Sequence, residues 1–112
     1  MNYSVKSIDV FEKQTKRLLK KYPSLKSDLQ LLVNQLKINP KQGVSIGNNC
    51  YKIRLAISSK GKGKSGGGRV ITTILFTEKT IYLLAIYDKS EKETLSDSEL
   101  NSLILQLICN VG

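Results

Sequence analysis

The spacing of apolar residues changes period along this chain, and that change limits the fold more than any other feature. In residues 10–21 and 25–38, apolar side chains recur every three or four positions, which is the spacing of one face of a helix. Pro23 lies between the two segments, so the connection is only two or three residues long and the helices should form an antiparallel hairpin. The same spacing returns in residues 100–108 after a Ser96–Glu99 capping box and predicts a final helix.

Between these helices the pattern is that of strands. Residues 51–58 alternate between apolar and polar side chains, and residues 69–76 and 81–88 are apolar enough for central strands. Residues 2–7 alternate weakly and are expected to add a short edge strand. The order β-α-α-β-β-β-α predicts an α+β fold with a small antiparallel sheet and an N-terminal helical hairpin packed on one face. We expect residues 1–112 to form one domain whose helices all cover that face.

The amino-acid composition limits the catalytic groups and cofactors that this chain could use. The 112 residues contain no histidine, which removes the usual general base and the usual zinc ligand. The two cysteines have neither the number nor the spacing of a zinc site or a disulfide framework. We therefore expect no metal or other cofactor, and any catalysis must use Lys, Arg, Tyr, Asp or Glu. No apolar run approaches the roughly 20 residues of a membrane span, and no export signal is present, so a cytoplasmic location without membrane contact is expected.

The positive charge is large and uneven. The formal net charge is +9, and residues 1–77 hold 15 Lys and Arg against 3 Asp and Glu. A basic surface on so small a domain indicates a polyanionic partner, because Lys and Arg contacts to phosphates release condensed counterions.

The segment KGKGKSGGGR, residues 60–69, concentrates glycine and basic residues. A phosphate-binding P-loop requires a glycine five residues before Gly63, and Ser58 stands there, so the spacing of that motif is not met. We interpret the segment as a long hairpin connection in which Lys60, Lys62 and Lys64 contact a nucleic-acid backbone.

Three cations are expected on one face of the sheet. Lys52 and Arg54 alternate with the apolar residues of their strand, and Arg69 begins the next strand. In an antiparallel pair these side chains can share the face opposite the helices, because successive residues of a strand point to opposite sides.

Several segments together resemble the RelE/ParE superfamily of bacterial toxins, most closely its HigB-like and RelE-like branches. The resemblance rests on CYKIRLAI (50–57), GGRVIT (67–72) and IYLLAIYDKSEKETLS (81–96), with KYPSLKSDL (21–29) similar to the HigB-like branch. It implies a toxin of a type II toxin-antitoxin system that cleaves mRNA in the ribosomal A site and is inhibited by a cognate antitoxin. It also implies a catalytic set that comprises Lys52, Arg54, Arg69, Lys89 and Lys92.

The resemblance has two departures. RelE has an arginine after the lysine of the YDKSEK segment, where this chain has Ser90, and a tyrosine further on, where this chain has Ser96. The general base is therefore open, with Lys92 or Tyr87 as substitutes. Two other functions stay open: a ParE-like inhibitor of DNA gyrase without nuclease activity, and a non-enzymatic, basic nucleic-acid-binding module. Codon preference and oligomeric state do not follow from the sequence.

Overall fold

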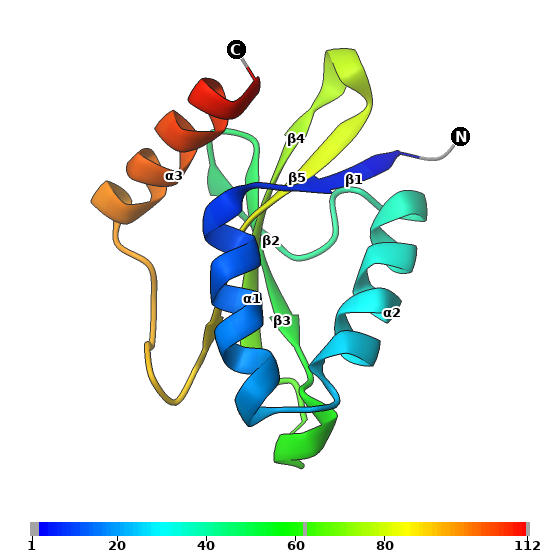
Figure 1. Ribbon diagram of the computed structural model, residues 1–112. Helices are drawn as coiled ribbons and strands as arrows, with labels where there is room; N and C mark the ends of the chain where they lie inside the picture. The colour runs from blue at the N-terminus through cyan, green and yellow to red at the C-terminus, as the bar shows by residue number, and fades with distance from the viewer. Residues whose placement is uncertain (1–2, 62, 112) are drawn as a thin grey trace.

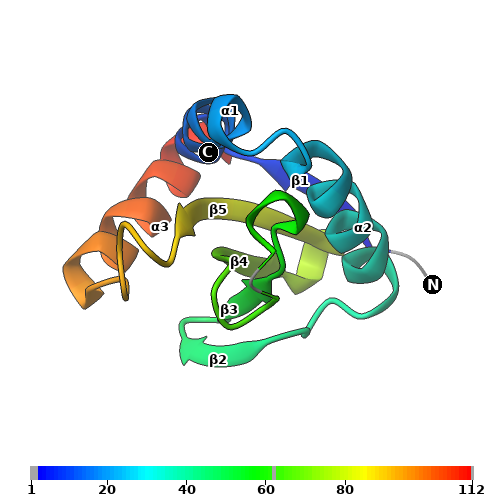
Figure 2. The same ribbon diagram turned by 90° about the horizontal axis from the view of Figure 1, so that it is seen from below.

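The fold is a five-stranded sheet with helices on both of its faces (Figures 1 and 2). The computed structural model describes residues 3–61 and 63–111, with side chains as far as residue 109. The strand order is β1-β5-β4-β3-β2. The strands are β1 (Ser4–Ser7), β2 (Val44–Gly47), β3 (Cys50–Leu55), β4 (Gly68–Leu75) and β5 (Thr80–Asp88).

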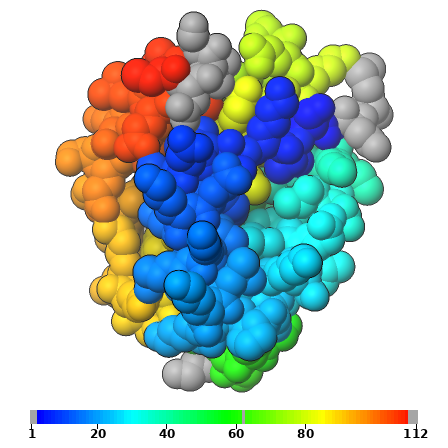
Figure 3. Space-filling model, viewed as in Figure 1, coloured from blue at the N-terminus to red at the C-terminus, as the bar shows by residue number. Residues whose placement is uncertain are grey.

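The predicted helical hairpin is confirmed. Helix α1 spans Asp9–Lys21 and α2 spans Leu25–Ile38, with a short connection around Pro23. The apolar stripes of the two helices lie against one face of the sheet, and Leu18, Leu25 and Leu36 have no exposed surface. The space-filling view shows α1 across the front of the molecule, between α2 and the segment that leads to α3 (Figure 3).

The sheet is mixed rather than purely antiparallel. Strands β3, β4 and β5 form the predicted antiparallel meander, but β1 pairs in parallel with β5, from Ser4 opposite Thr80 to Ser7 opposite Leu83. A parallel pair requires a long connection between its strands, and residues 8–79 separate β1 from β5.

Strand β2 was not predicted. Asn48 and Asn49 form the two-residue loop of a hairpin in which Gly47 lies opposite Cys50. Both asparagines have positive φ angles, 55° and 59°, as a two-residue hairpin turn of type I′ requires and as Asn tolerates. Val44 lies opposite Lys52, so β2 extends the sheet beyond β3.

The position of α3 (Asp97–Val111) corrects another expectation. Seen along the strands, α3 and α2 lie on opposite sides of the sheet, whereas all helices were expected on one side (Figure 2). The physical reason is that the second face also carries apolar residues: Ile71 and Ala85 are buried there, beside Leu100 and Leu103 of α3. The predicted capping box is present, since the Ser96 and Glu99 side chains each bond the other residue's backbone N–H at 3.1 Å. No helix among the described residues is long and apolar enough to cross a membrane.

Gly67 has no room for a side chain and supplies a test of the fold. A Cβ atom there would lie 2.1 Å from the carbonyl oxygen of Leu55, so Gly67→Ala must displace backbone. We expect Gly67→Ala to lower the free energy of unfolding by about 1–3 kcal/mol, measured by urea denaturation. Gly61→Asn is the control, because Gly61 has φ +67° with no atom within 4 Å, and Asn tolerates that conformation. Equal stabilities of the two variants would contradict the close contact.

Candidate functional site

The register of the central strands places the two predicted arginines side by side. Arg54 on β3 lies opposite Arg69 on β4, and Arg69 lies opposite Tyr87 on β5. Lys52 lies opposite Ile71, two residues along, and therefore shares that face of the sheet. The structure confirms that Lys52, Arg54 and Arg69 share a face of the sheet. The expectation that this face is free of helices is wrong, because α3 packs on it.

Arg69 is buried and holds the segment of residues 60–68, which is called the glycine-rich loop below. Only 4% of the residue is exposed. Its guanidinium group donates hydrogen bonds to the backbone carbonyls of Gly68, Lys64 and Ser65, at 2.9, 3.1 and 3.4 Å. Arg54 is exposed by contrast, and it borders a small hollow of about 140 Å³ together with Lys64 and the side of α2. In this conformation the Arg69 donors therefore face the loop, and Arg54 is the arginine open to solvent.

A buried ion pair anchors the start of the same loop. The ammonium group of Lys60 lies 2.6 Å from a carboxylate oxygen of Asp88, and the side chains are 7% and 0% exposed. Asp88 also accepts hydrogen bonds from the Tyr22 hydroxyl and from the backbone and hydroxyl of Ser90. Although burial alone raises the pKa of Asp88, the bonds from Lys60, Tyr22 and Ser90 outweigh it and hold that pKa well below its usual range. This group of Asp88, Lys60, Tyr22 and Ser90 is called the Asp88 cluster below.

A second carboxylate fixes the residues just before Lys60. Asp28 of α2 accepts hydrogen bonds from the hydroxyl of Ser58 at 2.7 Å and from its backbone N–H at 3.0 Å. Ser24 and Ser59 exchange two further bonds between a backbone N–H and a hydroxyl. Burial raises the pKa of Asp28, but the bonds from Ser58 and Ser24 lower it by more. The glycine-rich loop is thus held by α2 and Asp88 at one end and by Arg69 at the other.

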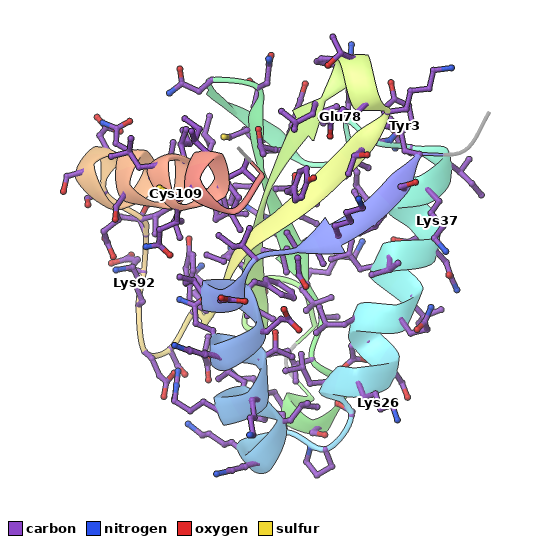
Figure 4. The ribbon with its side chains drawn as sticks, turned by 45° about the horizontal axis from the view of Figure 1, so that its top comes forward. Tyr3, Lys26, Lys37, Glu78, Lys92 and Cys109 are labelled. Atoms are coloured by element: carbon purple, nitrogen blue, oxygen red, sulfur yellow. The ribbon has the colours of Figure 1, made fainter. Side chains whose placement is uncertain are left out.

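The segment between β5 and α3 carries the last two predicted catalytic residues. Lys89 is exposed, and its backbone N–H donates to the Gly67 carbonyl at 3.1 Å, so it lies beside the glycine-rich loop. Lys92 is half-buried, and its ammonium group forms an ion pair with Glu99 at the start of α3. Figure 4 shows Lys92 on the segment that leads to α3, away from Lys26 and Lys37 of α2.

The five predicted catalytic residues do not share a single cavity. Lys92 and Tyr87 line a hollow of about 440 Å³ between β5 and α3. Lys52 lines another, of about 130 Å³, beside Ile71 and the start of α3. Arg54 borders the third hollow with Lys64. The sheet therefore brings Lys52 and the two arginines together, and Lys92 lies on the far side of Tyr87.

The predicted nucleic-acid contacts differ in their surroundings. Lys64 is exposed beside Arg54, as expected of a backbone contact. Lys60 is instead paired inside the protein with Asp88, which the sequence did not indicate. Lys62 lies outside the described residues.

Tyr87 on β5 lies opposite Arg69, which in turn lies opposite Arg54. Tyr87 also lines the hollow between β5 and α3. Burial raises the pKa of its hydroxyl, and nearby Arg69 offsets part of that effect. The hydroxyl oxygen is buried without a hydrogen-bond partner among the described residues. Because a raised pKa keeps the phenol protonated, Tyr87 is poorly suited to act as a general base. Among the described residues, no group of three or more His, Cys, Asp or Glu side chains could hold a metal ion.

The fold matches that of bacterial toxins of known structure, although no family model matches the sequence. A free-state mutant of E. coli toxin RelE aligns over 83% of this chain and 90% of its own, with a TM-score of 0.60 at 14% identity. The toxin-antitoxin complex RelBE2 from Mycobacterium tuberculosis aligns over 79% and 92%, with a TM-score of 0.54 at 13% identity. A metal-bound toxin from Helicobacter pylori aligns over 80% and 98%, with a TM-score of 0.51 at 19% identity. The chain therefore has the RelE fold, as its sequence motifs led us to expect.

Removing the charge of Asp88 tests the Asp88 cluster. We expect Asp88→Asn to lower the free energy of unfolding by about 3–5 kcal/mol at pH 7, because Lys60 is then buried without a counterion. The double variant Asp88→Asn/Lys60→Met, which removes both charges, should regain much of that loss. Chemical denaturation of the three proteins measures both effects.

The same variants predict a pH dependence. The folded-state pKa of Asp88 lies below its unfolded value, so its stabilising contribution is complete above the unfolded pKa of about 3.9 and declines as pH falls below it. Between about pH 5 and pH 3 the wild type should therefore lose stability more steeply than Asp88→Asn. Parallel curves for the two proteins over this range would contradict the assignment.

Proposed function

We propose that this chain is the toxin of a type II toxin-antitoxin system and that it cleaves mRNA in the A site of the ribosome. The observation that carries the proposal is the pairing of Arg54 with Arg69 on adjacent strands, with Lys52 on the same face, in a chain that has the RelE fold. The net charge of +9 supports a phosphate-rich partner. The proposed site of action is the cytoplasm, where translation takes place.

The proposed reaction is attack by a ribose 2′-hydroxyl on the adjacent phosphate, which breaks the bond from phosphorus to the 5′-oxygen of the next nucleotide and leaves a 2′,3′-cyclic phosphate. One proton is removed from the 2′-hydroxyl, and one is given to the departing 5′-oxygen. The enzyme must then orient the RNA strand, stabilise the negative charge that develops on the phosphate oxygens, and transfer two protons. Arg54 and Arg69 are suited to the phosphate, because a guanidinium group is permanently charged and its donors match the spacing of two phosphate oxygens. The ribosome would supply orientation that this shallow site lacks.

Proton transfer is assigned to the lysines and to Tyr87. Lys52 shares the face of the arginines, Lys89 is exposed beside the glycine-rich loop, and Lys92 lies next to Tyr87. Since Tyr87 is poorly suited to act as base, we assign that role to one of the three lysines, Lys52, Lys89 or Lys92. Lys64 is proposed to contact the RNA backbone beside Arg54.

Arg69 must exchange partners in this mechanism. Its donors bond loop carbonyls in the structure described here. A phosphate is a stronger acceptor than a carbonyl because the hydrogen bond is charge-assisted, so substrate can replace Lys64 and Ser65 if the loop moves aside.

The proposed protein partner is a cognate antitoxin. One structure with the same fold is a toxin-antitoxin complex, RelBE2. We propose that the antitoxin of this chain covers the face of Arg54 and Arg69 or α3, so that RNA is excluded from the site.

Substitution of Arg54 tests the nuclease directly. We expect Arg54→Ala to reduce mRNA cleavage by about 10²-fold or more through loss of phosphate stabilisation, with little change in stability because Arg54 is exposed. Arg69→Ala should abolish cleavage and should also loosen the loop. Primer extension on a translated message after induction measures cleavage, and Lys26→Ala, an exposed change on α2, should behave as the wild type.

Two outcomes would contradict the proposal. Cleavage by Arg54→Ala within a few-fold of the wild type would place the catalytic site elsewhere. Growth arrest with intact mRNA and damaged DNA would identify a gyrase inhibitor of the ParE type instead.

A further inference from the structure

The outward face of α1 carries a row of basic side chains that the proposed catalytic site does not use. The helix contains Lys13, Lys16, Arg17, Lys20 and Lys21. At about 100° per residue, these five side chains fall within an arc of about 140°. The arc lies opposite Phe11 and Leu18, which are buried against the sheet. This face of α1 forms much of the front of the molecule in Figure 3.

The row divides into paired and unpaired cations. Arg17 bonds both carboxylate oxygens of Glu91, at 2.8 and 3.2 Å, and Lys21 lies within 4.0 Å of Glu91 and Asp88. Lys13, Lys16 and Lys20 are exposed and form no ion pair among the described residues. We refer to these three residues as the lysine ridge. Like charges three or four positions apart on a helix repel one another, so the three lysines destabilise α1. A bound polyanion would reduce this repulsion.

The shape of the ridge favours a nucleic-acid duplex over a single strand. Seven residues separate Lys13 from Lys20, which corresponds to a straight, convex ridge about 10 Å long. Proteins that bind single strands combine a groove with exposed aromatic rings, whereas the aromatic side chains of α1 and its C-cap, Phe11 and Tyr22, are buried. The phosphates that line the groove of an RNA duplex need only a convex row of cations, without stacking.

The ridge is fixed relative to the candidate site. Arg17 ties the middle of α1 to Glu91, which lies between Lys89 and Lys92, and Tyr22 at the end of α1 bonds Asp88. A duplex bound on the ridge is therefore held at a constant position relative to the proposed catalytic residues.

We propose that the lysine ridge binds the phosphate backbone of double-helical RNA. In the setting of the proposed function, which this inference extends, the duplex is ribosomal RNA, and the ridge anchors the protein while the face of Arg54 receives the single-stranded message.

The test compares two triple substitutions of equal charge. Lys13, Lys16 and Lys20→Gln removes the ridge, and Lys26, Lys37 and Lys41→Gln removes three lysines on and after α2, two of which are labelled in Figure 4. Binding of each protein to a 20-base-pair RNA duplex and to vacant 70S ribosomes is measured over a range of KCl concentrations. For the ridge variant, the magnitude of the negative slope of log K against log salt should decrease by about two to three, and affinity should fall at least tenfold. The control variant should keep the wild-type slope.

Three outcomes would overturn the inference. Equal losses in both variants would mean that the lysines act only through net charge. An equal loss for a single-stranded RNA of the same length would remove the preference for a duplex. Unchanged RNA binding by the ridge variant, with lost binding to a polyglutamate peptide, would assign the ridge to an acidic protein. None of these assays measures cleavage, so they test the RNA-binding role of the lysine ridge independently of the proposed nuclease activity.

Discussion

The ion pair between Lys60 and Asp88 is the constraint on which the proposed site depends. It lies where four parts of the chain meet: the end of α1, the start of the glycine-rich loop, the end of β5 and the start of the segment that carries Lys89 and Lys92. A buried ion pair contributes little net stability compared with apolar packing, but it penalises any arrangement that separates the charges. The Asp88 cluster therefore specifies how two loops of low apolar content are placed relative to the arginines of the sheet.

Arg69 connects the fold to the proposed chemistry. Its guanidinium group satisfies the carbonyls of a loop that is too rich in glycine to be held by side-chain packing. The same donors are the ones expected to bind the scissile phosphate. The loop therefore has a closed arrangement on Arg69 and, in the proposed mechanism, an open one in which phosphate takes the place of the carbonyls. The anchors at Asp28 and Asp88 would hold the base of the loop in both arrangements.

The sequence predicted the helices and the central strands, because the spacing of apolar residues differs between the two. Because residues of a strand alternate between two faces, Lys52 and Arg54 share a face once their strand is assigned. That Arg69 shares it depends on the register of β3 and β4, which the sequence does not give and the structure supplies. The face covered by α3 did not follow, since the apolar stripe around Leu103 indicates only that the helix is buried somewhere. Strand β2 was missed because its four residues, Val44–Gly47, are too few and too polar to show an alternation.

The internal role of Lys60 was also not predictable, because its partner is 28 residues away. A lysine beside glycines looks the same in sequence whether it faces solvent or a buried carboxylate. The one available signal was Asp88 itself, an acidic residue at the end of a buried apolar strand. The ring of Tyr22 is buried in the core, but its hydroxyl belongs to the Asp88 cluster.

The central claim is that this face of the sheet promotes attack by a ribose 2′-hydroxyl. The most direct measurement is single-turnover cleavage, by the purified protein, of a ribosome-bound message that has one 2′-deoxy nucleotide at the cleavage position. The account predicts a 2′,3′-cyclic phosphate end on the all-ribose message and no cleavage at the deoxy position. Cleavage of the deoxy message at the same position would contradict it.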